Sequence, residues 1–276
     1  MNSLSQLGAV APLIGVVHLG PLPGQPGFTT LDALVGRALE EAEALVDAGL
    51  DAVLLENWED RSPGPFVGPD AVAALTVVTR EVVAAAGRPV GVNVLPNDYR
   101  AALALVAAAG ARFVEVDVLA DAVRTDYSYS DAPPFEVRVD PDDLAAWRER
   151  LGAREVPLLA QVHPKHYELL APALSLEASA RRAFELGADA VVVTGAATGA
   201  APDPAEVARL KEAAGARPVL IGSGLTVDNA AALLAAADGA IVGTALKTPD
   251  FARVDPVRAR ALVAAARGGE DAPPSA

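Results

Sequence analysis

Histidine and lysine are rare in this chain, and several of them lie where apolar runs end. His18 closes a run near the N-terminus, and the segment His163-Pro164-Lys165-His166 follows another. Imidazole transfers protons near neutral pH, and an ammonium group stabilises developing negative charge. We therefore expect proton transfer and charge stabilisation from this set. The spacing is not that of the helical His-Glu-x-x-His zinc motif.

Carboxylates end other apolar runs. Glu115 and Asp117 alternate with valines, so both side chains point to one side of an extended segment, and Glu56 closes an earlier run. Inward-facing carboxylates must be paired or bind a ligand, because unpaired burial costs several kcal/mol. A purely structural alternative pairs Glu115 and Asp117 with Arg124 or Lys165. The predicted catalytic residues are His18, Glu56, Asp117, His163 and Lys165.

Two glycine-bearing turns lie near the C-terminal end of the chain. They are Gly222-Ser223-Gly224 and Gly243-Thr244. Glycine lets backbone N–H groups approach an anion, and many barrels bind phosphate with the loops after strands seven and eight. We expect these N–H groups to converge on a phosphate, with hydroxyl donors from Ser223 and Thr244. The alternative is that the glycines only make tight turns.

The predicted ligand-binding residues share a place at the end of an apolar run or in the loop that follows. They are Asn57, Asn93, Asn97, Asp98, Glu115, Thr125, Asp126, His166, Thr194, Gly195, Gly222, Ser223, Gly224, Gly243 and Thr244. No cofactor is assigned. A divalent metal is an alternative, with His18, Glu56 and His163 as its candidate ligands.

Eight short apolar runs must position these side chains. They span Leu13–His18, Ala52–Glu56, Val90–Val94, Phe113–Asp117, Pro157–His163, Ala190–Thr194, Val219–Gly222 and Ala240–Val242. Helical patterns alternate with them over Leu31–Ala48, Pro69–Ala86, Asp98–Ala109, Pro141–Leu151, Leu176–Leu186, Asp203–Ala214, Val227–Ala237 and Asp255–Arg267. Strict alternation predicts a single (β/α)8 barrel domain over residues 1–276 with a loose tail at 268–276. A doubly wound open sheet is the alternative, but no Gly-x-Gly-x-x-Gly follows the first run.

Two long segments carry no expected helix or strand. Residues 58–68 and 120–139 follow the second and fourth runs. Loops of this length are usually lids or partner-binding segments. We expect both to close over the predicted site.

Composition limits the function further. The 276 residues carry a formal charge of −14 and no cysteine. This charge argues against binding to nucleic acid, and the absence of cysteine excludes disulfides and thiolate metal sites. No apolar run reaches the roughly 18 residues of a membrane span, and no basic leader precedes the first run, so we expect a cytoplasmic protein without membrane insertion. We also expect a homo-oligomer.

At these residues the sequence resembles the BtpA/SgcQ family of barrel proteins, named for a photosystem I biogenesis factor. The matching stretches are Gly15–Gly24, Glu56-Asn57 with Pro65-Phe66, Gly91–Asp98, Thr125-Asp126, His163–His166, Val193–Gly195 with Thr198-Gly199, Gly222–Gly224 and Val242–Lys247. The resemblance implies a barrel enzyme, whether a lyase, an isomerase or a hydrolase, acting on a small phosphorylated metabolite such as a sugar phosphate or a nucleotide-derived compound. The alternative it implies is a membrane-complex biogenesis factor, with Trp58, Phe66, Tyr127, Tyr129 and Phe135 as its interface anchors.

The sequence departs from the family pattern at several positions. Pro96 stands where the family usually has arginine, Asp117 where it has asparagine, and Gln161 where it has aspartate. The acidic segment from Glu56 to Phe66 is also longer than usual. These departures imply a divergent substrate or activity.

Overall fold

Eight parallel strands close into a barrel. The computed structural model describes residues 7, 9, 11–60, 62, 64–125, 133–195, 197 and 199–268. Neighbouring strands run in the order β1-β2-β3-β4-β7-β9-β10-β11, and β11 pairs with β1. Their bounds are Leu13–His18, Ala52–Glu56, Val90–Asn93, Phe113–Val116, Leu158–Val162, Ala190–Val193, Val219–Ile221 and Ala240–Val242. The predicted barrel is confirmed, and each strand lies within two residues of its expected bounds.

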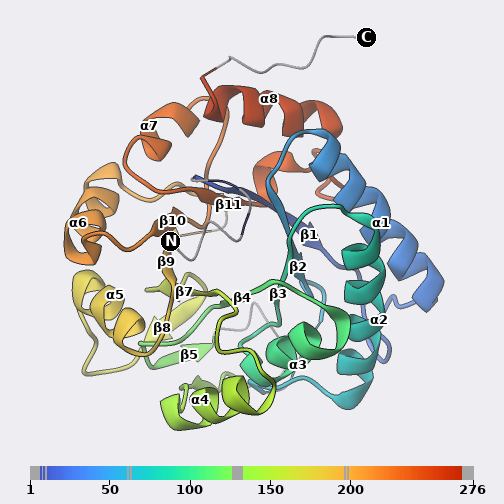
Figure 1. The fold of residues 1–276 in the computed structure, drawn as a ribbon, viewed down its shortest axis with the longest axis horizontal. Coiled ribbons are helices and arrows are strands. Elements are labelled where there is room, and N and C mark those ends of the chain that lie inside the picture. Colours follow the sequence, from blue (N-terminus) through green and yellow to red (C-terminus); the bar gives the residue numbers. More distant parts are fainter. Residues whose placement is uncertain are drawn as a thin grey trace.

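Helices form a ring around the strands, as Figure 1 shows. Eight α-helices lie in the described residues: α1 Leu31–Asp47, α2 Pro69–Ala85, α3 Tyr99–Ala109, α4 Pro141–Arg150, α5 Leu176–Glu185, α6 Pro204–Ala214, α7 Ala230–Leu234 and α8 Pro256–Ala266. Most begin at a capping side chain; Asp98, for example, accepts a hydrogen bond from the Ala101 N–H. None of the described helices is both long and apolar enough to cross a membrane.

Strand register sets the direction of each side chain at the barrel mouth. His18 pairs with Glu56, Glu56 with Asn93, and Asn93 with Glu115 across β1 to β4. In each strand these positions continue the alternation that places residues such as Ile14 in the buried interior of the barrel. The upper layer of the barrel interior is therefore polar and titratable.

The helix after β10 is shorter than predicted. The pattern over Val227–Ala237 yields only Ala230–Leu234 as α-helix. The Asn229 side chain accepts a hydrogen bond from the Thr226 N–H and donates one to the Gly224 carbonyl, which closes a turn in place of the first helical residues. A helix of five residues contributes little dipole to the neighbouring turn.

The expectation of no regular element in residues 120–139 is wrong for the part that the structure describes. Strands β5 (Val123–Thr125) and β6 (Glu136–Val137) pair there, and β5 also pairs with β8 (Tyr167–Leu169). Val118 packs with valines of this small antiparallel sheet in its own cluster. Strands of two and three residues are too short for alternation to reveal them in sequence. Residues 126–132 of this loop, and 269–276 of the predicted tail, lie outside the described residues.

A substitution at Gly91 of β3 tests the close packing of the barrel interior. A Cβ atom there would lie 2.2 Å from the Phe113 ring. We expect Gly91→Ala to lower the free energy of unfolding by about 1–3 kcal/mol, because the interior is close-packed. Gly36→Ala in α1 is the control: nothing lies within 4 Å of its added Cβ, so we expect a gain of about 0.5–1 kcal/mol. Urea denaturation measures both, and an unchanged Gly91→Ala midpoint would contradict this interior packing.

Candidate functional site

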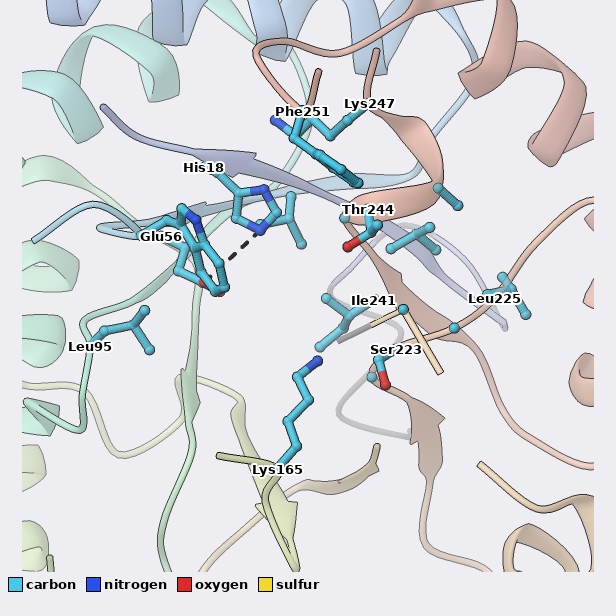
Figure 2. Close-up of a pocket in the computed structure, with 18 of the residues that line it drawn as sticks. His18, Glu56, Leu95, Lys165, Ser223, Leu225, Ile241, Thr244, Lys247 and Phe251 are labelled. Atoms are coloured by element: carbon cyan, nitrogen blue, oxygen red, sulfur yellow. Dashed lines mark ion pairs between the residues drawn. The ribbon is translucent and has the colours of Figure 1, made fainter. Parts of the chain in front are cut away.

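A cavity of about 790 Å³ opens at the carboxyl ends of the barrel strands. Figure 2 shows residues that line it, with His18 and Glu56 on one side and Thr244 and Ser223 on the other. Ten of the predicted site residues line this cavity. They are His18, Glu56, Glu115, Asp117, Lys165, Gly222, Ser223, Gly224, Gly243 and Thr244.

His18 and Glu56 are neighbours whose pKa values are shifted in opposite directions, so that the carboxyl keeps its proton and the imidazole does not. The His18 Nε2 atom lies 3.9 Å from the Glu56 Oε1 atom. Burial, with the nearby charges of Lys247, Lys165 and Arg37, lowers the pKa of His18 to about 3. Burial and the Asp117 carboxylate raise the pKa of Glu56 to about 8. At neutral pH the histidine is therefore a free base and the carboxyl is a proton donor.

A second carboxyl pair lies beside Glu56 and is bridged by an amide. The Gln161 Nε2 atom donates to Glu115 Oε1 at 3.1 Å and to Asp117 Oδ1 at 2.9 Å. The Asn93 side chain also donates to Asp117 Oδ1, at 3.0 Å. Burial, together with Asp117 and Glu56, raises the pKa of Glu115 well above its usual range. The structural alternative predicted hydrogen bonds or ion pairs to Arg124 or Lys165, whereas these hydrogen bonds come from the amides of Gln161 and Asn93.

Gln161 and Asp117, two of the positions expected to depart from the family pattern, are joined by one of these hydrogen bonds. The hydroxyl of Tyr167 in β8 also reaches Asp117, at 3.1 Å from Oδ2. The small antiparallel sheet is therefore linked to the floor of the cavity.

Lys165 extends into the cavity from a strained turn. The residues that flank the turn, His163 and His166, have φ values of 48° and 68°, which side chains other than glycine rarely adopt. Figure 2 shows the Lys165 side chain reaching from the end of β7 toward the centre of the cavity. Within the described part of the chain its ammonium makes no hydrogen bond or ion pair. An ammonium without a partner in a cavity is placed to meet an anion.

The glycine turns present unpaired backbone donors. In the described residues, the N–H groups of Ser223, Gly224, Gly243 and Thr244 make no hydrogen bond. The expectation that the Gly222 N–H and the Ser223 hydroxyl also face the anion is wrong. The Gly222 N–H donates to the Val193 carbonyl at 2.7 Å, and the Ser223 hydroxyl lies between the Gly195 N–H and the Ala200 carbonyl, at 3.0 and 3.1 Å.

Gly224 and Gly243 are glycine for different reasons. Gly224 has a φ of 71°, and a Cβ there would lie 2.2 Å from the backbone of Ala200 and Ala201. A bulky residue at 224 would therefore displace a neighbouring loop as well as fill the site. A Cβ at Gly243 would lie 2.8 Å from the His18 ring, so this glycine leaves room for the imidazole.

His163 does not join the other predicted catalytic residues. Its ring Nε2 atom lies 3.0 Å from the Leu174 carbonyl, away from the cavity lining, and its backbone N–H donates to Asp121. The positive φ at His163 ends the strand alternation, so the side chain leaves the direction that β7 would give it. The metal set of His18, Glu56 and His163 is therefore not assembled, and the described residues contain no group of three metal-ligating side chains.

Several predicted ligand-binding residues instead brace the loops behind the cavity. The Asn57 side-chain amide donates a hydrogen bond to the Leu95 carbonyl and accepts one from the Leu95 N–H. The Asn97 side chain makes the same two hydrogen bonds with the backbone of Val118. Asp98 caps α3. Thr125 pairs with the backbone of Phe135. Asn93, Thr194, Gly195 and His166 also lie outside the cavity lining, and Asp126 lies outside the described residues.

Sequence reasoning missed or misplaced several residues of the cavity lining. Arg37 and Gln161 line it from α1 and β7. Lys247 lines the cavity too, is 1% exposed and forms a buried ion pair with Glu41 of α1. Burial lowers the pKa of Lys247. The only signal for Arg37 and Lys247 was a charge on a helix face or in a loop far along the chain, and periodicity cannot assign such a charge to a site.

The expected interface aromatics have other positions. Trp58 lines the cavity, and its ring centroid is 5.2 Å from that of His18. Phe66 packs against Tyr99 and Arg100, with centroid distances of 6.0 and 4.5 Å. Phe135 packs against the small sheet. Tyr127 and Tyr129 lie outside the described residues.

The raised pKa of Glu56 predicts a pH-dependent stability. From about pH 4.3, the usual glutamate value, up to about pH 8, the unfolded chain releases this proton while the folded chain keeps it. Glu56 therefore lowers the free energy of unfolding as the pH rises, by up to about 1.4 kcal/mol per pH unit. We expect Glu56→Gln to become progressively more stable than the original chain across this window.

Urea denaturation at several pH values measures this difference. Glu59→Gln, at a cavity-lining residue with an exposed side chain, is the matched control and should give a constant difference. A pH-independent difference for Glu56→Gln would show that Glu56 is ionised in the folded protein.

Comparison with known proteins finds relatives that match most or nearly all of the chain. It is 35% identical over 269 residues to the photosystem I biogenesis protein BtpA of Synechocystis, covering 96% of this chain and 91% of that protein. It is 39% identical over 238 residues to the uncharacterized protein PH1209 of Pyrococcus horikoshii, covering 86% and 87%.

Solved structures share the fold at low identity. Tryptophan synthase from Mycobacterium tuberculosis matches with a TM-score of 0.59 and 21% identity over 96% of this chain and 98% of that one. The N-(5'-phosphoribosyl)anthranilate isomerase of Pyrococcus furiosus matches with a TM-score of 0.55 and 15% identity, covering 93% and 99%. The model of the BtpA family matches residues 9–268, and the chain belongs to that family.

Proposed function

We propose that the protein is an enzyme that moves protons on a small phosphorylated metabolite, as an isomerase or a lyase does. One observation carries this proposal: a neutral histidine and a protonated carboxyl face the same cavity as a cluster of unpaired backbone N–H groups. A base, an acid and an anion site together are what such a reaction needs.

The phosphate would bind at the turns after β10 and β11. Unpaired N–H groups of Ser223, Gly224, Gly243 and Thr244 can each donate to a phosphate oxygen. Lys165 extends into the same cavity and adds positive charge. The site is thus locally suited to an anion, although the chain as a whole carries a charge of −14.

The proton transfers would be shared between two side chains. His18, unprotonated at neutral pH, takes a proton from the substrate. Glu56, protonated at neutral pH, gives one to the oxygen on which negative charge develops, and Lys165 stabilises that charge. The 3.9 Å between Nε2 and Oε1 allows both to reach adjacent atoms of one substrate.

The comparisons support a phosphorylated substrate through one structural neighbour, whose name specifies a phosphoribosyl compound. The name of the Synechocystis relative favours a role in photosystem I biogenesis. The described structure gives that role little support, because Trp58 lines the cavity and Phe66 packs against its neighbours.

The anion site is tested by adding a charge at Thr244, whose side chain lines the cavity. We expect Thr244→Asp to weaken binding of ribose 5-phosphate at least about tenfold relative to Thr244→Asn, about 1.4 kcal/mol, because only the charge differs between the two variants. Isothermal titration calorimetry measures both affinities. Equal affinities would place the phosphate elsewhere.

The proton transfer is tested by isotope exchange. We expect the protein to catalyse exchange of carbon-bound hydrogen for deuterium in a ketose or aldose phosphate dissolved in D₂O, followed by proton NMR. Replacement of His18 by Asn or of Glu56 by Gln should slow this exchange about 100-fold or more, because each removes one partner of the proton transfer. Arg258→Gln, on the exposed surface of α8, is the control and should exchange normally. Phosphate binding without exchange across a panel of such compounds would indicate a binding protein.

A further inference from the structure

Phe251 is an exposed aromatic residue with a left-handed backbone conformation. Its side chain is 63% exposed, and its backbone φ is 58°. An exposed aromatic ring gains little from burial, and a bulky residue in the left-handed region is strained. Both features are unfavourable for the folded chain alone, and strain of this kind clusters at ligand-binding sites.

The loop that carries Phe251 is firmly braced. The Phe251 N–H donates to the Thr248 carbonyl at 2.8 Å, and the Thr248 hydroxyl donates to Asp250 at 2.6 Å. Arg37 of α1 donates to the Ala252 carbonyl at 2.6 Å. These contacts fix the backbone on both sides of the ring, so the strained conformation is imposed by the loop.

The ring also lines the cavity that holds the proposed site. In Figure 2, Phe251 lies near Lys247 at the top of the view, above His18 and Thr244, and Lys165 extends from below. A second exposed aromatic residue lines the same cavity: Trp58 is 41% exposed and lies against the His18 ring at a centroid distance of 5.2 Å. The His18 imidazole thus has one large aromatic ring, Trp58, against it, and Phe251 lines the same cavity.

The size of the cavity matters too. Ligand pockets span roughly 300–1,000 Å³, and this one, at about 790 Å³, is large for a bare sugar phosphate. With phosphate at the turns after β10 and β11, space remains between those turns and the rim. The rim surfaces offered to the rest of the ligand are apolar and aromatic at Trp58 and Phe251.

We propose that the substrate is a phosphomonoester that carries a planar aromatic or heteroaromatic ring, and that Trp58 and Phe251 contact this ring. The inference rests on the proposed function for the phosphate position. Aromatic side chains bind planar rings by stacking, with little dependence on ring identity. The ring at the rim and the phosphate at the glycine turns would hold the atoms between them beside His18 and Glu56.

Calorimetry with four probes tests the inference: AMP, ribose 5-phosphate, adenosine and inorganic phosphate. We expect AMP to bind at least about tenfold more tightly than ribose 5-phosphate. Phe251→Ala should weaken AMP about tenfold and ribose 5-phosphate less than twofold. Phe66→Ala is the matched control, because Phe66 is 40% exposed and lies outside the cavity lining; it should change neither affinity.

Fluorescence adds a direct report of stacking. The chain has two tryptophans, Trp58 and Trp147, so Trp147→Phe leaves Trp58 as the single indole. We expect AMP to quench its emission and inorganic phosphate to leave it unchanged. The calorimetry does not require the Trp147→Phe substitution, so its result stands even if that variant folds poorly.

The outcomes separate the inference from the proposed function. If ribose 5-phosphate binds as tightly as AMP, and Phe251→Ala changes neither, the ring contact is overturned and the phosphate site stands. If adenosine and AMP bind equally while ribose 5-phosphate and phosphate do not bind, the phosphate position is overturned and the ring contact stands. If no probe binds, both are overturned and the rim aromatics must serve another partner.

Discussion

The strand register of the barrel is the constraint on which the site depends. Parallel pairing from β1 to β4 puts His18, Glu56, Asn93 and Glu115 in one layer, all directed into the barrel. The backbone leaves these side chains no other direction, so each must find a partner inside or change its protonation state. The reversed protonation of His18 and Glu56 is a consequence of this geometry.

Charge is distributed so that the interior tolerates several carboxyl groups. Glu115 and Asp117 share the Gln161 amide, and burial raises the pKa of both Glu115 and Glu56. Lys247 is neutralised by Glu41 behind the lining. Lys165 is left with its charge directed into the cavity, which is the arrangement that an anionic ligand complements.

The sequence predicted the strands and most helices because buried parallel strands are continuous apolar runs, and Asp, Ser or Pro marks where helices begin. It predicted His18 and Glu56 because both end such runs. It failed at His163, where a left-handed backbone turns the side chain away, and at Asn57 and Asn97, whose amides bond to backbone in other loops. It also missed Arg37 and Phe251 as cavity-lining residues, because a residue type alone does not reveal which loop or helix face will border a cavity.

The close contact between Gly224 and the backbone of Ala200 and Ala201 has a thermodynamic consequence. Ser223 joins the same two segments by bonding to Gly195 and Ala200. The loop after β9 and the turn after β10 therefore cannot separate without breaking these contacts. An anion that bound the unpaired N–H groups of this turn would therefore also favour the packed position of the loop, because two equilibria that involve the same turn are linked and each would shift the other by the same factor.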